Sequence, residues 1–273
     1  MGETESVERH VRAWMTAEVA AGTDIALLVA VSRAPVAQES LTVLAGSRPH
    51  PVTETRDRFG SRLHTVTGLP AGQVEIVYAA RGIIPAPVPH PGDVDAETAE
   101  HLRPSRYCEV DEFTGIAREI VGGRTGIEAA DAVVDWVGDQ LDYVPGSSTV
   151  TDSARTTYDS RQGVCRDYAH LTVALLRASG IPARCASAYA PGLSPMDFHL
   201  VVEALVEGTW LVLDSTRLAP RASMVRIATG QDAADTAFMT TLAGNVTLTG
   251  IQVTAVADPE LPREDPRERL SLR

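Results

Sequence analysis

Two short apolar stretches on either side of Glu207-Gly208 restrict the possible folds of this chain more than any other feature. Residues 200–206 and 210–213 are rich in valine and leucine, as expected of strands that are buried in a sheet. A pair such as Glu207-Gly208 suits the tight turn of a two-residue hairpin. The sequence therefore predicts an antiparallel hairpin in which Val206 pairs with Thr209.

The register of this hairpin places a histidine beside a carboxylate. Val201 lies opposite Asp214, and His199 shares a face of its strand with Val201, so His199 and Asp214 become diagonal neighbours. A four-residue loop would keep this arrangement, whereas a three-residue loop would break it. In such a pair the carboxylate fixes the tautomer and the orientation of the imidazole. The simpler alternatives are a hydrogen-bonded surface histidine and an aspartate that caps a turn.

A cysteine lies at the beginning of a predicted helix upstream of the hairpin. The helix is predicted over residues 163–179 and ends where Gly180 and Pro182 follow. Cys165 falls in its first turn, where unpaired N–H groups favour a thiolate and can hold an oxyanion. A single cysteine in a helix is more often a small buried residue. Its meaning therefore depends on what lies nearby in the fold.

Together, three residues provide the parts of a thiol-dependent acyl-transfer site. Cys165 would be the nucleophile, His199 the base that takes and returns its proton, and Asp214 the residue that orients His199. The coincidence of all three in this order makes the catalytic interpretation stronger than any one of them does. We therefore predict a Cys165–His199–Asp214 triad.

Other histidines and cysteines offer weaker alternatives. His170 follows Cys165 by five residues, a rotation of about 140° around a helix, and is predicted to have a packing role. Cys185 is predicted to be a buried core thiol. A zinc-dependent hydrolase could use Cys165, His170, Cys185 and His199, but no CxxC or HxxxH spacing supports such a site. We therefore expect no metal and no cofactor.

The chain is predicted to contain two domains and a tail. Short alternating or apolar stretches make residues 1–92 a β-rich, sandwich-like domain, and the segment Ile84 to Gly92 holds four prolines, as in an extended connector. Residues 93–258 form the catalytic domain, with helices predicted over 111–121 and from 125 onward. Helices followed by a run of strands indicate an α+β fold with an antiparallel sheet. Residues 259–273 are predicted to be a flexible tail.

Charge and cysteine content exclude several classes of protein. The net charge is −12, and all 24 basic residues are arginine. Such an acidic chain is unsuited to non-specific binding of nucleic acid or anionic membrane. No apolar stretch approaches the roughly 20 residues of a membrane span, and the acidic start lacks a secretion-signal pattern. Three cysteines are too few for a disulfide scaffold, so a cytoplasmic location is expected.

The central motifs resemble those of bacterial transglutaminase-like proteins. The nucleophile segment covers residues 157–176, with the resemblance strongest over 161–177, and the turn Ala-Ser-Gly-Ile-Pro-Ala-Arg covers 178–184. A histidine strand, an aspartate strand and a later loop follow at residues 198–204, 210–216 and 230–235. The first hundred residues resemble the β domain that often precedes this core. The resemblance implies a papain-like fold in which a cysteine-bearing helix packs on an antiparallel sheet. It also implies that Cys165, His199 and Asp214 are the triad.

The resemblance leaves the reaction open, and our leading hypothesis is acyl transfer at an amide, with hydrolysis favoured over cross-linking. The substrate would be a peptide or another amide, and the thioester would be hydrolysed or passed to an amine. Clustered acidic ligands for calcium are not seen, so a calcium-gated cross-linker is not expected. Gln162 and Tyr158 are candidates for the second oxyanion donor. The alternative is a catalytically silent member that binds a protein partner, with the N-terminal domain as the contact surface.

Overall fold

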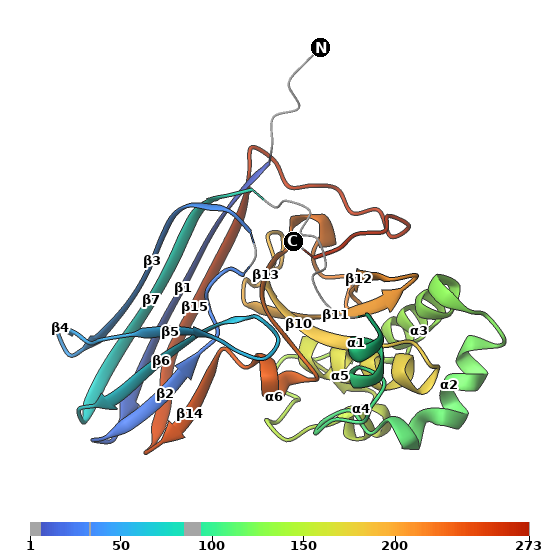
Figure 1. The fold of residues 1–273 in the computed structure, drawn as a ribbon, viewed down its shortest axis with the longest axis horizontal. Coiled ribbons are helices and arrows are strands. Elements are labelled where there is room, and N and C mark those ends of the chain that lie inside the picture. The colour runs from blue at the N-terminus through green and yellow to red at the C-terminus, as the bar shows by residue number, and fades with distance from the viewer. Residues whose placement is uncertain (1–6, 33, 85–93, 273) are drawn as a thin grey trace, which may run out of the picture.

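The molecule has a β-sandwich on one side and a helix-covered sheet on the other (Figure 1). The structure is a computed structural model, and it describes residues 7–32, 34–84 and 94–272. The connector predicted over residues 84–92 lies outside the described residues except for Ile84.

Alternating apolar residues form the two sheets of the sandwich. In β1 (Glu8–Val19) every second side chain from Arg9 onward is buried, which is the pattern of a strand with one face on the core. The first sheet has the order β15 (Val246–Asp258), β1, β7 (Gly72–Ile83), β3 (Val36–Ala45), β4 (Arg48–Pro49). The second has the order β14 (Met239–Ala243), β2 (Thr23–Leu27), β6 (Arg62–Leu69), β5 (Thr53–Arg56).

A third sheet, antiparallel throughout, forms the base of the other half. Its order is β12 (Thr209–Leu213), β11 (Phe198–Val206), β10 (Ala183–Tyr189), β13 (Val225–Gly230). A small parallel pair joins β8 (Asp142–Tyr143) to β9 (Gln162–Gly163). These sheets, the helices and the N-terminal β region confirm the predicted α+β, papain-like fold.

The same half of the molecule contains the helices (Figure 1). They are α1 (Val94–Glu100), α2 (Thr114–Val121), α3 (Gly126–Gln140), α4 (Ala154–Ser160), α5 (Cys165–Ala178) and α6 (Ala233–Thr236), with short 3-10 turns at Val110–Phe113 and Arg221–Ser223. The central helix α5 packs against β11 and β10 (Figure 1), and its residues from Asp167 to Arg177 are all buried. Within the described part of the chain, no helix is long and apolar enough to cross a bilayer.

The strand pairing differs from the division expected at residues 92 and 258. Although β14 and β15 follow the catalytic region in sequence, they pair with β2 and β1 of the sandwich. The reason is that β1 pairs with β7 along only one edge, so its other edge needs a strand to satisfy its backbone groups. Residues 239–258 therefore belong to the sandwich rather than to the catalytic region.

The tail predicted to be flexible packs against the third sheet. Leu272 is 5% exposed, and its carbonyl accepts a hydrogen bond of 2.8 Å from Arg226 Nη2. The Val212 N–H donates to the Leu270 carbonyl at 2.7 Å. The charged composition of the segment obscured its two apolar anchors, Leu270 and Leu272, which supply the burial that orders it.

The sandwich and the third sheet share one apolar core. Tyr189, Val225 and Ile227 of the third sheet belong to the same buried cluster as the sandwich residues. Tyr189 stacks on Tyr78 with ring centroids 6.1 Å apart, and its hydroxyl donates to the Val29 carbonyl at 2.8 Å. Such a continuous core holds the two halves in one fixed arrangement.

Candidate active site

The hairpin that carries the candidate histidine and aspartate has the predicted register. Val206 pairs with Thr209, so the loop contains only Glu207 and Gly208. Their φ angles are 50° and 77°, and tight two-residue turns of this kind need positive φ at both positions. Glycine adopts such a conformation without strain, whereas Glu207 must tolerate it.

His199 and Asp214 meet at the end of this hairpin. His199 Nε2 lies 2.8 Å from Asp214 Oδ2, and the two residues are 1% and 7% exposed. The other carboxylate oxygen, Oδ1, accepts hydrogen bonds from the Thr216 hydroxyl at 2.7 Å and from the Thr216 N–H at 2.9 Å. Both oxygens of Asp214 are therefore held, and the carboxylate has a fixed direction toward the imidazole ring.

The charges of the pair stabilise each other. Burial alone would lower the pKa of His199, but the Asp214 charge and hydrogen bond, with a further contribution from Cys165, raise it to about 10. Burial would raise the pKa of Asp214, but the His199 charge and the hydrogen bonds from His199 and Thr216 lower it below its ordinary value. The arrangement thus favours an imidazolium beside an ionised carboxylate at neutral pH.

Cys165 is the first residue of α5, and the Asp167 carboxylate caps this end of the helix. Asp167 Oδ2 accepts a hydrogen bond of 2.7 Å from the Val164 N–H, and its Oδ1 accepts one of 2.8 Å from the Ser148 hydroxyl. A Cβ on Gly163 would lie 2.5 Å from the Asp167 Cβ, so only glycine permits this close approach. The cap leaves the N–H of Cys165 at the open end of the helix, where an anion is stabilised.

The free nitrogen of His199 is the one available to Cys165. His199 Nδ1 is buried and makes no regular hydrogen bond to the described residues, while Nε2 is engaged by Asp214. Cys165 is half-buried, and it interacts with His199 strongly enough to raise the pKa of the ring. His199 thus binds Asp214 through Nε2 and leaves Nδ1 free for Cys165. The structure places all three predicted site residues together.

Comparisons with known proteins show which family this chain belongs to. The sequence profile of the transglutaminase-like superfamily matches residues 114–215, the region from α2 to just past Asp214. The crystal structure of a "Putative Cysteine Protease" from Cytophaga hutchinsonii is similar over 97% of this chain and 96% of that one, with 30% sequence identity and a TM-score of 0.85. This chain belongs to the transglutaminase-like superfamily.

Two further similarities are more limited. The protein ML0607 of Mycobacterium leprae is 35% identical over 91 residues, a match that covers 33% of this chain and only 33% of that protein. The periplasmic domain of TgpA from Pseudomonas aeruginosa is 18% identical over 74% of this chain and 91% of that one, with a TM-score of 0.42.

One residue of this transglutaminase-like core that the sequence did not single out is Tyr143. Burial and the charge of an ionised Cys165 raise the pKa of its hydroxyl to about 12, while the backbone N–H of Cys165 acts to lower it. The hydroxyl is therefore near enough to Cys165 for the charge and the N–H of that residue to change its pKa. The parallel pairing of Tyr143 with Gly163 brings it there. No motif in the sequence indicated this pairing, because each strand has only two residues.

The two residues named earlier as possible oxyanion donors have other environments. Gln162 is exposed in β9. Tyr158 stacks on Trp136 with centroids 6.1 Å apart and packs under Arg161, whose guanidinium lies 4.2 Å from the ring centroid. Tyr143 is the better candidate because of its position next to Cys165.

His170 and Cys185, which the alternative zinc site would use, have separate environments in the transglutaminase-like core. His170 is fully buried, stacks on Tyr107 at 5.1 Å, and its Nε2 accepts a hydrogen bond from the Ala233 N–H. Cys185 is a buried core thiol, and burial raises its pKa well above the ordinary value. Among the described residues, no three His, Cys, Asp or Glu side chains form a group that could hold a metal ion.

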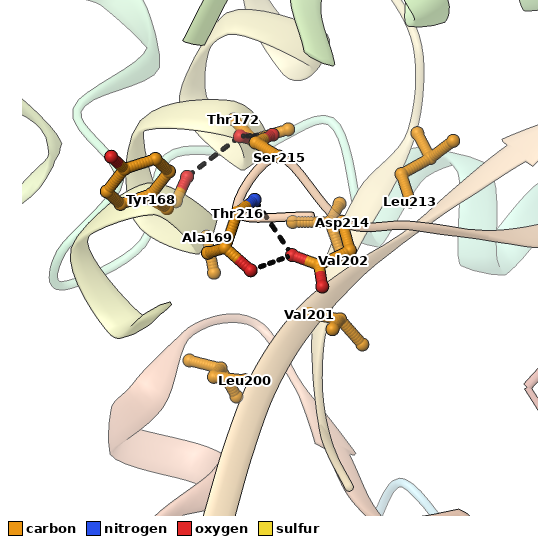
Figure 2. Close-up of a pocket in the computed structure, with 10 residues that line it drawn as sticks. All are labelled: Tyr168, Ala169, Thr172, Leu200, Val201, Val202, Leu213, Asp214, Ser215 and Thr216. Atoms are coloured by element: carbon orange, nitrogen blue, oxygen red, sulfur yellow. Dashed lines mark hydrogen bonds between the residues drawn. The ribbon is translucent and has the colours of Figure 1, made fainter. Parts of the chain in front are cut away.

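A small cavity lies behind the aspartate, and it is not the substrate site. Figure 2 shows it between Tyr168 and Thr172 of α5 and the strand ends that carry Leu200 and Asp214. It has no room for a water molecule, and neither Cys165 nor His199 lines it. The hydroxyl of Thr172 lies 2.8 Å from that of Ser215 across this gap. This contact fastens the segment that follows Asp214 to the helix that carries Cys165.

Proposed function

We propose that this protein is a thiol-dependent amide hydrolase whose catalytic residues are Cys165, His199 and Asp214. The observation that carries the proposal is the 2.8 Å pair of His199 and Asp214, whose free imidazole nitrogen is available to a cysteine at a helix N-terminus. Membership of the transglutaminase-like superfamily and the likeness to the Cytophaga protein support a thiol-based reaction.

The reaction proceeds through two acyl transfers. The Cys165 sulfur attacks the amide carbonyl carbon and forms a C–S bond, and the carbonyl electron pair moves to oxygen. Protonated His199 gives its proton to the amine, the C–N bond breaks, and a thioester remains. Water then attacks the thioester, His199 takes a proton from the water, and the acid leaves as the sulfur is restored. Asp214 keeps the imidazole in one tautomer and orientation throughout.

The oxyanion that forms in each transfer needs fixed donors. The N–H of Cys165 at the start of α5 is one of them. We assign the second to the hydroxyl of Tyr143, because it is near Cys165 and its high pKa keeps it protonated and able to donate. Hydrolysis is favoured over cross-linking since water is always present, whereas amine transfer requires a dedicated acceptor pocket.

Selective alkylation of the cysteines tests the proposal. The folded protein is treated with iodoacetamide between pH 6 and pH 9, and mass spectrometry identifies the labelled sites. Cys165 should react far faster than Cys108, which is an internal control because burial raises its pKa to about 12. The change His199→Ala should slow the labelling of Cys165 at pH 6 without changing that of Cys108.

A substrate screen then defines the reaction. Unfolded casein and a mixture of short peptides are incubated with the protein, and new termini or deamidated side chains are identified by mass spectrometry. Cys165→Ala is the matched control. If Cys165 in the folded protein reacts no faster than Cys108 across the pH range, the proposed mechanism is wrong. The alternative is then a catalytically silent member of the superfamily that binds a protein partner.

A further inference from the structure

The strand that leads to Asp214 lies at the edge of its sheet. β12 is the first strand in the order β12-β11-β10-β13, and Asp214 directly follows its last residue. Edge strands fray more easily than central ones because one side of their backbone has no partner in the sheet. A catalytic carboxylate in this position needs support from outside the sheet.

The C-terminal segment, residues 259–272, supplies this support at Val212. The Val212 N–H donates to the Leu270 carbonyl at 2.7 Å. The Val212 carbonyl accepts a hydrogen bond of 3.1 Å from Arg221 Nη1. The Ser271 hydroxyl donates to the carbonyl of Trp210, two residues earlier, at 2.8 Å. The free edge of β12 is therefore paired just before Asp214.

Arg221 connects β12 to the C-terminal segment. Its N–H and Nε donate to the two carboxylate oxygens of Glu264, each at 2.7 Å, and its Nη2 donates to the Asp265 carbonyl at 2.8 Å. The side chain of Arg221 is 9% exposed and that of Glu264 is 33% exposed, so the guanidinium is largely buried while water reaches the carboxylate. Two hydrogen bonds to one carboxylate nevertheless fix the direction of the Arg221 side chain. Arg221 follows Asp214 in sequence while it holds Val212, which precedes Asp214.

The same segment also contacts the loop before the histidine strand. A Cβ on Gly192 would lie 2.9 Å from Leu261 Cδ2 and 3.0 Å from Pro220 Cδ. The Ser223 hydroxyl donates to the Pro191 carbonyl at 2.8 Å. The loop that leads to His199 and the loop that follows Asp214 are thus packed against each other beneath residues 259–272.

We propose that Arg221, anchored by the C-terminal segment, is a positioning residue that fixes Asp214 toward His199. This inference rests on the proposed function, because it assigns Arg221 a role only through the His199–Asp214 pair. Loss of the anchor lets the end of β12 move, and the carboxylate then no longer holds the imidazole in line with Cys165.

The test uses the full chain with Arg221→Gln. We expect iodoacetamide labelling of Cys165 to slow by about tenfold at pH 6, because a small displacement of a reacting group has effects of this size. The difference in labelling rate between Arg221→Gln and the wild type should narrow at pH 10, because a thiol ionises there without help from a base. The matched control is Arg269→Gln, which removes an ion pair of 2.7 Å with Asp131 in the same segment but leaves the contacts with Val212.

A second variant shows whether the slower labelling comes from the loss of the anchor or from a general loss of folding. Leu272→Ala removes a buried anchor of the segment without touching Arg221, and it should slow the labelling at pH 6 in the same pH-dependent way. Circular dichroism and Tm measure whether each variant is folded. If folded Arg221→Gln or Leu272→Ala labels like the wild type while His199→Ala is slow, the role of Arg221 is refuted and the triad stands. If His199→Ala also labels like the wild type, the proposed function itself fails.

Discussion

His199 Nε2 lies 2.8 Å from Asp214 Oδ2, and a single hairpin brings these two residues together. The contact therefore depends first on the pairing of β11 with β12, which are neighbours in the sequence. Cys165 must be brought to it by the packing of α5 on the same sheet. The acid–base half of the site is local in sequence, and the nucleophile is not.

The change Asp214→Asn should strongly reduce the reactivity of Cys165. The amide cannot provide the negative charge that raises the pKa of His199, and it can hold the ring in the wrong tautomer. We expect labelling at pH 6 or turnover of an identified substrate to fall on the order of 10²- to 10⁴-fold. Asp139→Asn, an exposed position on α3, is the control. Equal rates for both variants would contradict the role of Asp214.

Stability should depend on pH through His199. Its pKa is about 10 in the folded protein and 6.5 as the ordinary value, so the folded state keeps a proton that the unfolded state releases above pH 6.5. The contribution is thus fully present below pH 6.5 and is lost as pH rises toward 10. Urea unfolding of the wild type and of His199→Gln should show a difference that shrinks over this range. A difference that grows with pH would disprove the raised pKa.

The change Tyr143→Phe separates thiol activation from oxyanion stabilisation. The hydroxyl is needed only when a carbonyl oxygen becomes charged, so alkylation of Cys165 should change little. Turnover of an identified amide substrate should fall by about 10²- to 10³-fold, as for the loss of one oxyanion donor. Tyr158→Phe, in a tyrosine that packs on Trp136, is the control. A loss of alkylation and turnover in equal measure would assign Tyr143 to thiol activation instead.

A buried ion cluster in the catalytic sheet should be important for stability. Glu203 is fully buried, accepts a hydrogen bond of 2.8 Å from Arg184 Nε and one of 3.1 Å from Arg226 Nη1. Glu203→Gln removes the negative charge that compensates the positive charges of the two buried arginines. We therefore expect a loss of about 3 to 5 kcal/mol in the free energy of unfolding.

An exposed ion pair provides the matched comparison. Arg155 and Asp159 form an i,i+4 pair of 2.7 Å on α4, and Asp159→Asn should lower the free energy of unfolding far less than Glu203→Gln does, because water screens an exposed pair. Chemical denaturation of both variants measures the contrast. Comparable losses would mean that the Glu203 cluster is effectively solvated.

The sequence predicted the elements whose determinants are local. Residues around Glu207-Gly208 defined the hairpin, its register and hence the contact between His199 and Asp214, because the turn and the strand alternation are set within a few residues. The helix that carries Cys165 was predictable because its end is encoded locally by Gly180, and Cys165 lies in its first turn.

The features that the sequence did not predict depend on contacts between distant segments. Tyr143 approaches Cys165 through a two-residue parallel pair, which has no periodic pattern. Residues 259–272 appeared flexible by composition, yet Leu270 and Leu272 find an apolar surface on the catalytic sheet. Nor did the sequence indicate that β15 would pair with β1, since an alternating strand does not specify its neighbour.

The return of β14 and β15 to the sandwich affects how the protein acquires its structure during synthesis. The catalytic region is inserted between β7 and β14, so the sandwich receives its last two strands only after that region has been translated. Pairing over such sequence distances is slow, and the unprotected edge of β1 remains exposed on the nascent chain until then. The sandwich, and with it the core that it shares with the third sheet, can therefore be completed only after the region between β7 and β14 has been synthesised.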